Sequence, residues 1–510
     1  MESADGQRGR DGGSLRRSPL NVIMSQIRRK RSFSDRKPLG RFLSRSSSQT
    51  GIPEDGEPEA REDKGGQSSG DSERHMGWGG VSVFLQRLGK KSDSRNLRLG
   101  HCDLTATDLL ELASLLQFLP QLEEVDVSWN ELIGGSLAAL TSHMQQVSGI
   151  RTLRICSCRL NANDVAALGN SLGSVPLLEI LDLSWNSGVG GGALQGLLGK
   201  LQPVLRELHL VACQLTAADA AVLGGVVAAL PRLSLLDVSC NPQLSQEVDA
   251  GGFKQLAASL SHATNLTTLR LQACGLTANG IDALGGSLRY LPSVRELDLS
   301  CNKQLSGGLS RLTCHLAHVT HLESLDLHLC CLSHSDLEQL TLVVPYLRSV
   351  DVSWCKVVGG RLSLLLDSLQ PSIILELRLS SCDLITDDLH HLAAASRRGF
   401  LSSLRVLDLS YNGSVGDEGW SALFSAGGLG SLEDVDVSLR PSSSTRCSAW
   451  LPSLLRALPR WAALARLALQ RWTVGSEDRR LLDFILRKRS VLLEWDQDGR
   501  ELRGTEQPEE

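Results

Sequence analysis

Apolar residues recur along this chain at an interval of about 28 positions. The recurring unit reads Leu-x-Leu-x-x-Asn/Cys, with Val or Ile replacing Leu in some copies. Its first apolar residue stands at Leu97, Val125, Leu153, Leu181, Leu208, Leu236, Leu269, Leu297, Leu325, Val350, Leu377, Leu407, Val435 and Leu467. The starts are 25 to 33 residues apart, and fourteen copies in one register indicate a repeat protein rather than several unrelated domains.

Each copy predicts a strand followed by a helix. The Leu-x-Leu alternation has the period of a half-buried strand, whereas Leu109, Leu112 and Leu116 follow at helical spacing. Thr105 and Ser333 each precede an Asp by three residues, which is typical of a capped helix start. We therefore expect an α/β fold, a right-handed leucine-rich-repeat solenoid or horseshoe, with a parallel sheet on its concave face and helices on its convex face.

The segments outside the repeats have a different composition. Residues 1–76 are rich in Arg, Ser, Gly and acidic residues without apolar periodicity, which predicts a disordered tail, basic and then acidic. We expect an N-terminal cap at 77–94, about fourteen repeats over 95–475, and a C-terminal cap at 476–503, followed by a disordered tail at 504–510. The apolar run Val491–Trp495 predicts a final strand within that C-terminal cap.

The sixth position of the unit alternates between Cys and Asn. The first nine copies carry Cys102, Asn130, Cys158, Asn186, Cys213, Asn241, Cys274, Asn302 and Cys330. We expect these side chains to be buried and to bond the backbone of the turn that follows each strand. The alternation breaks at Cys355, Arg440 and Trp472, which predicts irregular late repeats, the thirteenth with a loop through 441–444.

This alternation resembles the ribonuclease-inhibitor-like class of leucine-rich repeats, in which two units of about 28 residues take turns. The resemblance covers roughly residues 95–475 and implies protein binding on a horseshoe. Ribonuclease inhibitor uses aromatic and acidic residues on its inner face against basic ribonucleases. The present chain departs from a strongly acidic face, because Arg residues stand among the acids at the middle of the Leu-x-Leu motif.

The middle positions form a charge ladder along the predicted sheet. They are Arg98, Asp126, Arg154, Asp182, His209, Asp237, Arg270, Asp298, Asp326, Asp351, Arg378, Asp408, Asp436 and Ala468. Over the first eight copies opposite charges alternate, which predicts cross-strand pairs worth roughly 0.2–1 kcal/mol each. Later, Asp298, Asp326 and Asp351 are consecutive, as are Asp408 and Asp436. These acids either belong to the scaffold or attract a basic partner.

Large aromatic residues precede the sixth position in four of the alternate copies. They are Trp129, Trp185, Trp354 and Tyr411. Such residues either pack between neighbouring repeats or bind a partner, and Trp and Tyr dominate protein interfaces. We expect them, with the acids Asp298, Asp326, Asp351, Asp408 and Asp436, to contact an unidentified protein partner on the concave face.

Composition and charge limit which partners and which cellular locations we expect for the protein. A net charge of -5 and a pI of about 6.2 predict no nucleic-acid partner, and no apolar run is long enough to span a membrane. Aromatics make up only 4%, which predicts an aliphatic core. More than half of the 13 Cys residues stand at the sixth position as reduced structural thiols. These features, with no apparent signal peptide, favour a cytoplasmic or nuclear protein, which we expect to be monomeric.

The sequence contains no constellation typical of an enzyme. There is no phosphate-binding Gly-x-x-x-x-Gly-Lys-Ser/Thr loop, and the His residues stand in different copies without a nucleophile. We expect neither a cofactor nor a metal site. In the tail, Ser34 and Ser44 follow an Arg by three residues, which suits basophilic kinases. The alternative function is therefore a structural solenoid whose phosphorylatable basic tail recruits partners, or carries an import signal.

Overall fold

The structure is a computed structural model that describes residues 95–246, 251–316, 319 and 321–495. The chain divides into two units, residues 1–75 and 76–510. The predicted tail at 1–76, the predicted cap at 77–94, Ser34 and Ser44 lie outside the described residues, as do 496–503 of the C-terminal cap and the tail at 504–510.

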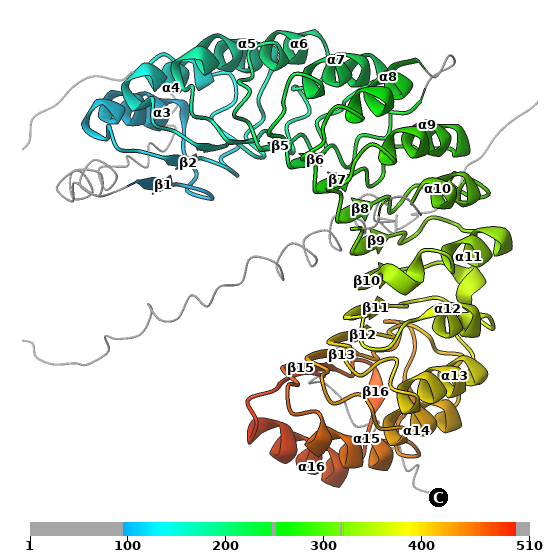
Figure 1. Cartoon of the computed structure of the whole chain (residues 1–510). Coiled ribbons are helices and arrows are strands. Elements are labelled where there is room, and N and C mark those ends of the chain that lie inside the picture. The colour runs from blue at the N-terminus through cyan, green and yellow to red at the C-terminus, as the bar shows by residue number, and fades with distance from the viewer. Residues whose placement is uncertain (1–94, 247–250, 317–318, 320, 496–510) are drawn as a thin grey trace, which may run out of the picture. The chain divides into compact units, whose positions relative to one another are not determined.

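One parallel sheet of fifteen strands runs through the described part of the second unit (Figure 1). The strands are β1 Asn96–Arg98, β2 Glu124–Asp126, β3 Thr152–Arg154, β4 Ile180–Asp182, β5 Glu207–His209, β6 Leu235–Asp237, β7 Thr268–Arg270, β8 Glu296–Asp298, β9 Ser324–Asp326, β10 Ser349–Asp351, β11 Glu376–Arg378, β12 Val406–Asp408, β13 Asp434–Asp436, β15 Arg466–Ala468 and β17 Leu492–Glu494. All fourteen predicted motif starts are strand centres, and β17 lies inside the apolar run Val491–Trp495. The strands pair in chain order, so each repeat contacts mainly its two neighbours.

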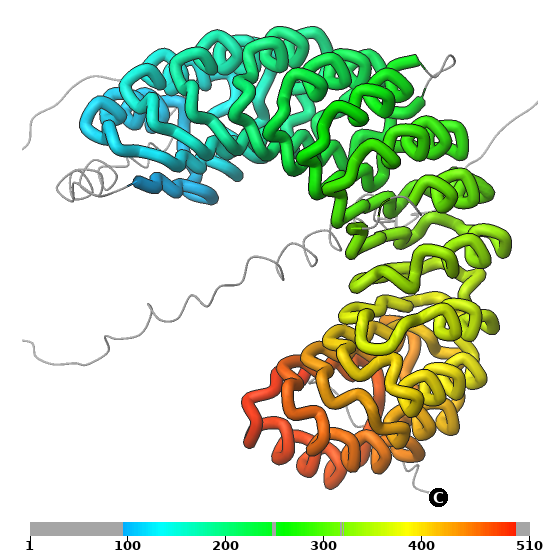
Figure 2. Tube along the Cα trace, viewed as in Figure 1, coloured from blue at the N-terminus to red at the C-terminus, as the bar shows by residue number. Residues whose placement is uncertain are grey.

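The helices form a second layer, and Figure 2 shows the repeats stacked in chain order. They are α3 Ala106–Leu115, α4 Leu137–Thr141, α5 Ala162–Ser171, α6 Gly192–Leu198, α7 Ala217–Val227, α8 Gly251–Leu260, α9 Ala278–Leu288, α10 Leu309–Leu316, α11 His334–Leu340, α12 Leu362–Ser368, α13 Thr386–Arg397, α14 Asp417–Ser425, α15 Leu451–Ala457 and α16 Ser476–Arg487. Short 3-10 turns are η1 Leu116–Phe118, η2 Met144–Val147, η3 Leu172–Ser174, η4 Val344–Tyr346, η5 Lys356–Val358 and η6 Leu458–Arg460. The α/β leucine-rich-repeat solenoid is thereby confirmed.

The helix caps also join one repeat to the next. Thr105 and Ser333 form capping boxes with Asp108 and Asp336, as the sequence predicts. The Asp336 carboxylate also accepts the amides of Gly307 and Leu309 from the preceding repeat, at 2.7 and 3.0 Å. Burial would raise the pKa of Asp336, but these hydrogen bonds and those from Ser333 lower it below its ordinary value. A capping acid therefore stabilises two consecutive helix starts.

The core is aliphatic over most of the repeats, but the prediction of an aliphatic core is wrong near the C-terminal end. Trp420, Phe424, Trp450, Trp461 and Trp472 are buried there and contact one another, with the Trp450 and Trp472 rings 4.9 Å apart edge to face. A second small sheet, β14 Thr445–Arg446 with β16 Trp472–Thr473, follows the predicted irregular loop. Rings from α14 to β16 thus form an aromatic part of the core in the last repeats.

Candidate functional site

The Asn at the sixth position connects consecutive repeats. Asn130 Oδ1 accepts the amides of Cys102 and Leu104 from the preceding repeat, both at 3.0 Å. Its Nδ2 donates to the carbonyls of Leu99 and Val127, at 2.9 and 2.7 Å. The same arrangement recurs at the later Asn positions, so the predicted bonding of the turn backbone is confirmed.

The Cys residues at the sixth position are buried thiol donors as predicted, except Cys102 in the first repeat, which is only half-buried. Cys158 Sγ lies 3.3 Å from the carbonyl oxygens of Val127 and Cys156. Burial raises the pKa of Cys158 to about 11 and that of Cys213 to about 12. Both thiols therefore stay protonated near neutral pH and remain hydrogen-bond donors with little nucleophilic character.

The residue before the sixth position adopts a left-handed backbone. In the first twelve repeats its φ lies between 52 and 66°, including 64° at Trp129, 65° at Trp185, 66° at Trp354 and 64° at Tyr411. This turn directs the next side chain into the core, while the amide of Trp129 still reaches the carbonyl of Cys156 in the next repeat at 2.7 Å. Bulky residues seldom adopt this conformation. The backbone therefore does not account for aromatics at four of these positions.

The four aromatics are half-buried and lie at the end of the strands that carry the charge ladder. The Trp129 ring stacks on His101 of the preceding repeat, with centroids 5.2 Å apart and planes 11° from parallel. Within the described ranges, Trp185, Trp354 and Tyr411 have no ring partner. Packing between neighbouring repeats therefore accounts for one aromatic and leaves three with exposed ring surface.

The charge ladder exists in the predicted register, but its predicted pairing is only partly right. Arg98 faces Asp126 across the sheet, and Asp298, Asp326 and Asp351 occupy consecutive strands. The closest ion pairs of the ladder arginines go instead to Glu residues at the first strand position: Arg98–Glu124 at 2.8 Å, Arg154–Glu124 at 2.7 Å, Arg270–Glu296 at 2.9 Å and Arg378–Glu376 at 3.1 Å. A second row of the same face thus neutralises the arginines.

The ladder acids have a backbone role that the sequence analysis missed. The Oδ1 atom of each acid accepts a hydrogen bond from the backbone amide two residues later, at 2.9 to 3.1 Å. The acids are Asp126, Asp182, Asp237, Asp298, Asp326, Asp351, Asp408 and Asp436. This side-chain turn holds the chain where it leaves the strand. The recurring spacing Asp-x-Ser was the available signal.

Asp408 and Asp436 form a carboxylate pair on adjacent strands. They occupy the same register position, and Arg466 lies 3.2 Å from Asp436 and 2.7 Å from Asp434. Burial, followed by the charge of Asp436, raises the pKa of Asp408 to about 7. This end of the acidic row therefore changes charge near neutral pH.

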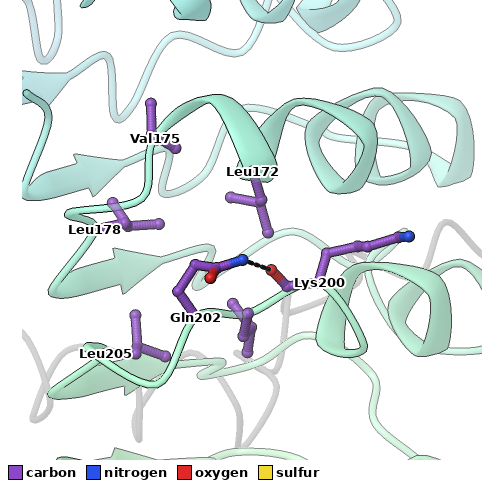
Figure 3. Close-up of a pocket in the computed structure, with 7 residues that line it drawn as sticks. Leu172, Val175, Leu178, Lys200, Gln202 and Leu205 are labelled. Carbon is purple, nitrogen blue, oxygen red and sulfur yellow. Dashed lines mark hydrogen bonds between the residues drawn. The ribbon is translucent and has the colours of Figure 1, made fainter. Parts of the chain in front are cut away.

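A small apolar hollow lies between two neighbouring repeats (Figure 3). It is lined by Leu172, Val175, Leu178, Lys200, Leu201, Gln202 and Leu205, and it encloses no space large enough for a water molecule. Ordinary ligand sites hold roughly 300–1,000 Å³, and no catalytic side chains converge here. In the described ranges, no group of three His, Cys, Asp or Glu residues is placed to hold a metal.

None of the helices in the described ranges is long and apolar enough to cross a membrane. A family model described as Leucine Rich repeat matches residues 262–285 and 400–424. Among solved structures, an internalin from Listeria monocytogenes is similar with a TM-score of 0.41 and 16% identity, over 71% of this chain and 94% of that one.

The matches to two relatives cover different shares of those proteins. NACHT, LRR and PYD domains-containing protein 12 of Homo sapiens is 32% identical over 261 residues, which are 49% of this chain and 24% of that protein. Ribonuclease inhibitor of Sus scrofa is 32% identical over 378 residues, which are 71% of this chain and 79% of the inhibitor. The repeats, their Asn and Cys ladder and this match show that the chain belongs to the ribonuclease-inhibitor-like leucine-rich-repeat family.

Proposed function

We propose that this protein is an interaction scaffold that holds a partner protein on the strand face, the side of the sheet turned away from the helices. Leucine-rich repeats generally bind protein partners. The anchors of the proposed contact are Trp129, Trp185, Trp354 and Tyr411. One observation carries this proposal: three of these rings keep exposed surface without a ring partner, at a backbone position that bulky residues seldom adopt.

The acidic positions Asp298, Asp326, Asp351, Asp408 and Asp436 complete the proposed face. Each carboxylate holds a turn amide through Oδ1. Four of these acids are half-buried and could make a second contact, whereas Asp351 is only 5% exposed and would act through its charge. The ladder arginines make their closest ion pairs with Glu residues, and three acids on the consecutive strands β8–β10 add negative charge to this part of the face. This arrangement favours a partner with basic groups opposite β8–β10.

We further propose that the protein acts in the cytoplasm or the nucleus, as a monomer, and without enzymatic activity, cofactor or nucleic-acid partner. The location is supported by the free thiols, because the buried Cys residues of the ladder donate to backbone carbonyls and form no disulfide among the described residues. Ribonuclease inhibition itself is not proposed, since the strand face carries arginines among its acids.

The test compares interacting proteins recovered with the full chain and with Trp129→Asn/Trp185→Asn/Trp354→Asn. Asn removes the ring and tolerates a positive φ, so the turns keep their geometry. A matched control, Tyr290→Ala/Tyr346→Ala, removes exposed aromatics from the helix side. We expect the Trp variant to lose specific partners and the control to keep them. Unchanged recovery with the Trp variant would refute the anchors.

Deletion of residues 1–76 tests the alternative function. A structural solenoid that recruits through its tail loses its partners on this deletion, whereas a scaffold that binds on the strand face keeps them. Replacing Ser34 and Ser44 by Ala adds a finer test, because only tail-dependent recruitment responds to phosphorylation there.

A further inference from the structure

A group of polar side chains lies beside two of the four aromatics, where the chain leaves β10–β13. We name it the edge cluster, and it consists of Lys356, Ser381, Asp383 and Arg440. Ser381 is the left-handed residue of its repeat, between Trp354 of the preceding repeat and Tyr411 of the next.

Both cations of the edge cluster converge on the same two groups. Lys356 Nζ lies 2.5 Å from Asp383 Oδ1 and 3.4 Å from Ser381 Oγ. Arg440 Nη2 lies 2.9 Å from Ser381 Oγ and 3.6 Å from Asp383 Oδ1. One carboxylate thus neutralises two cations only partly.

Arg440 reaches this position because its repeat is irregular. It stands at the sixth position, where the earlier repeats bury Asn or Cys, but its side chain extends across one whole repeat to Ser381. In the repeat between them the sixth position is the buried Asn412, which accepts the amide of Cys382. The Arg440 guanidinium thus reaches past a repeat that keeps the regular pattern.

The edge cluster has hydrogen-bond donors to spare. Ser381 Oγ accepts from both cations, and the Ser381 side chain is fully buried. The side chains of Lys356, Arg440 and Asp383 are 47, 45 and 55% exposed. An incoming carboxylate could therefore contact an ammonium and a guanidinium in one place, while the buried Ser381 holds the two cations together.

The surplus of positive charge is specific to this aromatic pair. Beside Trp129, the corresponding charges are Glu131 and Arg159, which form a single balanced pair at 2.5 Å. On the sheet next to the edge cluster, the carboxylates of Asp351 and Asp408 accept turn amides. Negative charge thus lies on the sheet and net positive charge at its edge, which fixes where an acidic group of a partner fits.

We propose that the edge cluster, together with Trp354 and Tyr411, binds a carboxylate side chain in an acidic segment of the partner protein. This inference rests on the proposed function, since it assigns a chemical class to what the aromatics contact. The aromatic rings supply apolar contact on either side, and the two cations, which the buried Ser381 holds together, select the acid.

The test measures binding of a fluorescein-labelled ten-residue polyglutamate peptide to the full chain at low salt by anisotropy. Lys356→Gln and Arg440→Gln should each weaken binding about fivefold, the upper range for an exposed ion pair. Asp383→Asn should strengthen it by a similar factor, because it removes the competing carboxylate and Asn tolerates the φ of 56°.

Arg159→Gln is the matched control, because it removes the same charge beside Trp129. It should bind the peptide like the wild-type chain, and a polyglutamine peptide should bind none of the variants. Equal weakening by Arg159→Gln, or unchanged binding by both Lys356→Gln and Arg440→Gln, overturns the inference. Thermal unfolding of each variant confirms that the chain remains folded.

The same variants separate this inference from the proposed function. If Lys356→Gln and Arg440→Gln keep the cellular partners while Trp354→Asn loses them, the edge cluster does not select the partner but the scaffold proposal stands. If Trp129→Asn/Trp185→Asn/Trp354→Asn also keeps every partner, the scaffold proposal fails, and the inference fails with it.

Discussion

Asn241 offers a quantitative test of how consecutive repeats are held together. Its Oδ1 accepts the amides of Cys213 and Leu215 at 3.0 and 2.9 Å, and its Nδ2 donates to the carbonyls of Leu210 and Val238 at 2.9 and 2.7 Å. The side chain is fully buried. Replacing it with Ala deprives two amides and two carbonyls of these partners, and among the four only the Val238 carbonyl keeps another side-chain donor, Cys274 Sγ at 3.3 Å.

The expected cost of Asn241→Ala follows from those four groups. A buried polar group left without a partner costs roughly 1–3 kcal/mol, and relaxation of the turn recovers part of the total. We expect a loss of about 4 kcal/mol. Asn241→Cys should cost less, because Cys355 occupies the equivalent position naturally and its Sγ lies 3.3 Å from the carbonyl oxygen of Leu327.

Urea unfolding followed by circular dichroism measures the free energy, and hydrogen exchange at the amides of Cys213 and Leu215 locates the loss. Asn265→Ala is the matched control, since Asn265 is exposed and donates one hydrogen bond to the Pro231 carbonyl at 2.7 Å. We expect it to cost less than about 1 kcal/mol. Similar costs for Asn241→Ala and Asn265→Ala would refute the argument.

Three further changes have defined outcomes. Burial and Asp436 raise the pKa of Asp408 to about 7. The protonated carboxyl therefore stabilises the fold at low pH, and this stability is lost as the pH rises through about 7. Asp408→Asn should remove this pH dependence from melting curves recorded between about pH 4 and 8. Trp472→Phe removes an indole bond of 2.7 Å to the buried Val437 carbonyl and should cost roughly 1–3 kcal/mol in urea unfolding; no change would contradict that role. Exposed Cys314 and Cys331 should react with iodoacetamide at pH 8 well before the buried ladder thiols, as mass spectrometry of the digested chain can show; equal rates would contradict the protection of the ladder.

The sequence alone predicted the fourteen repeat strands of the large sheet, but not β14 and β16 of the small one. Residues such as Leu97 and Val435 are strand centres because a repeat buries its apolar residues against its neighbours, and this requirement recurs at every copy. The same reasoning identified the buried Asn and Cys positions, since a turn next to the core must bond its backbone locally. Capped helix starts at Thr105 and Ser333 followed from short spacings.

The tertiary structure decided which side chains meet. Arg98 faces Asp126 in the register, yet its closest ion pair is with Glu124. Both acids lie on the same face of β2, so the register alone does not tell which of them the long Arg98 side chain contacts. Likewise, Arg440 looked only like a break in the pattern, and only the fold showed its contact with Ser381 from two repeats earlier.

For the candidate site, too, the sequence predicted one part and the structure supplied the rest. The repeat register alone placed Trp129, Trp185, Trp354 and Tyr411 at one position of the unit. Only the structure gave that position its positive φ and showed that His101 covers one of the four rings. The repeat pattern is visible along the chain, so the sequence determined the scaffold. The exposure of a side chain and the balance of charges around it depend on side chains from several repeats, so the fold decided the surface.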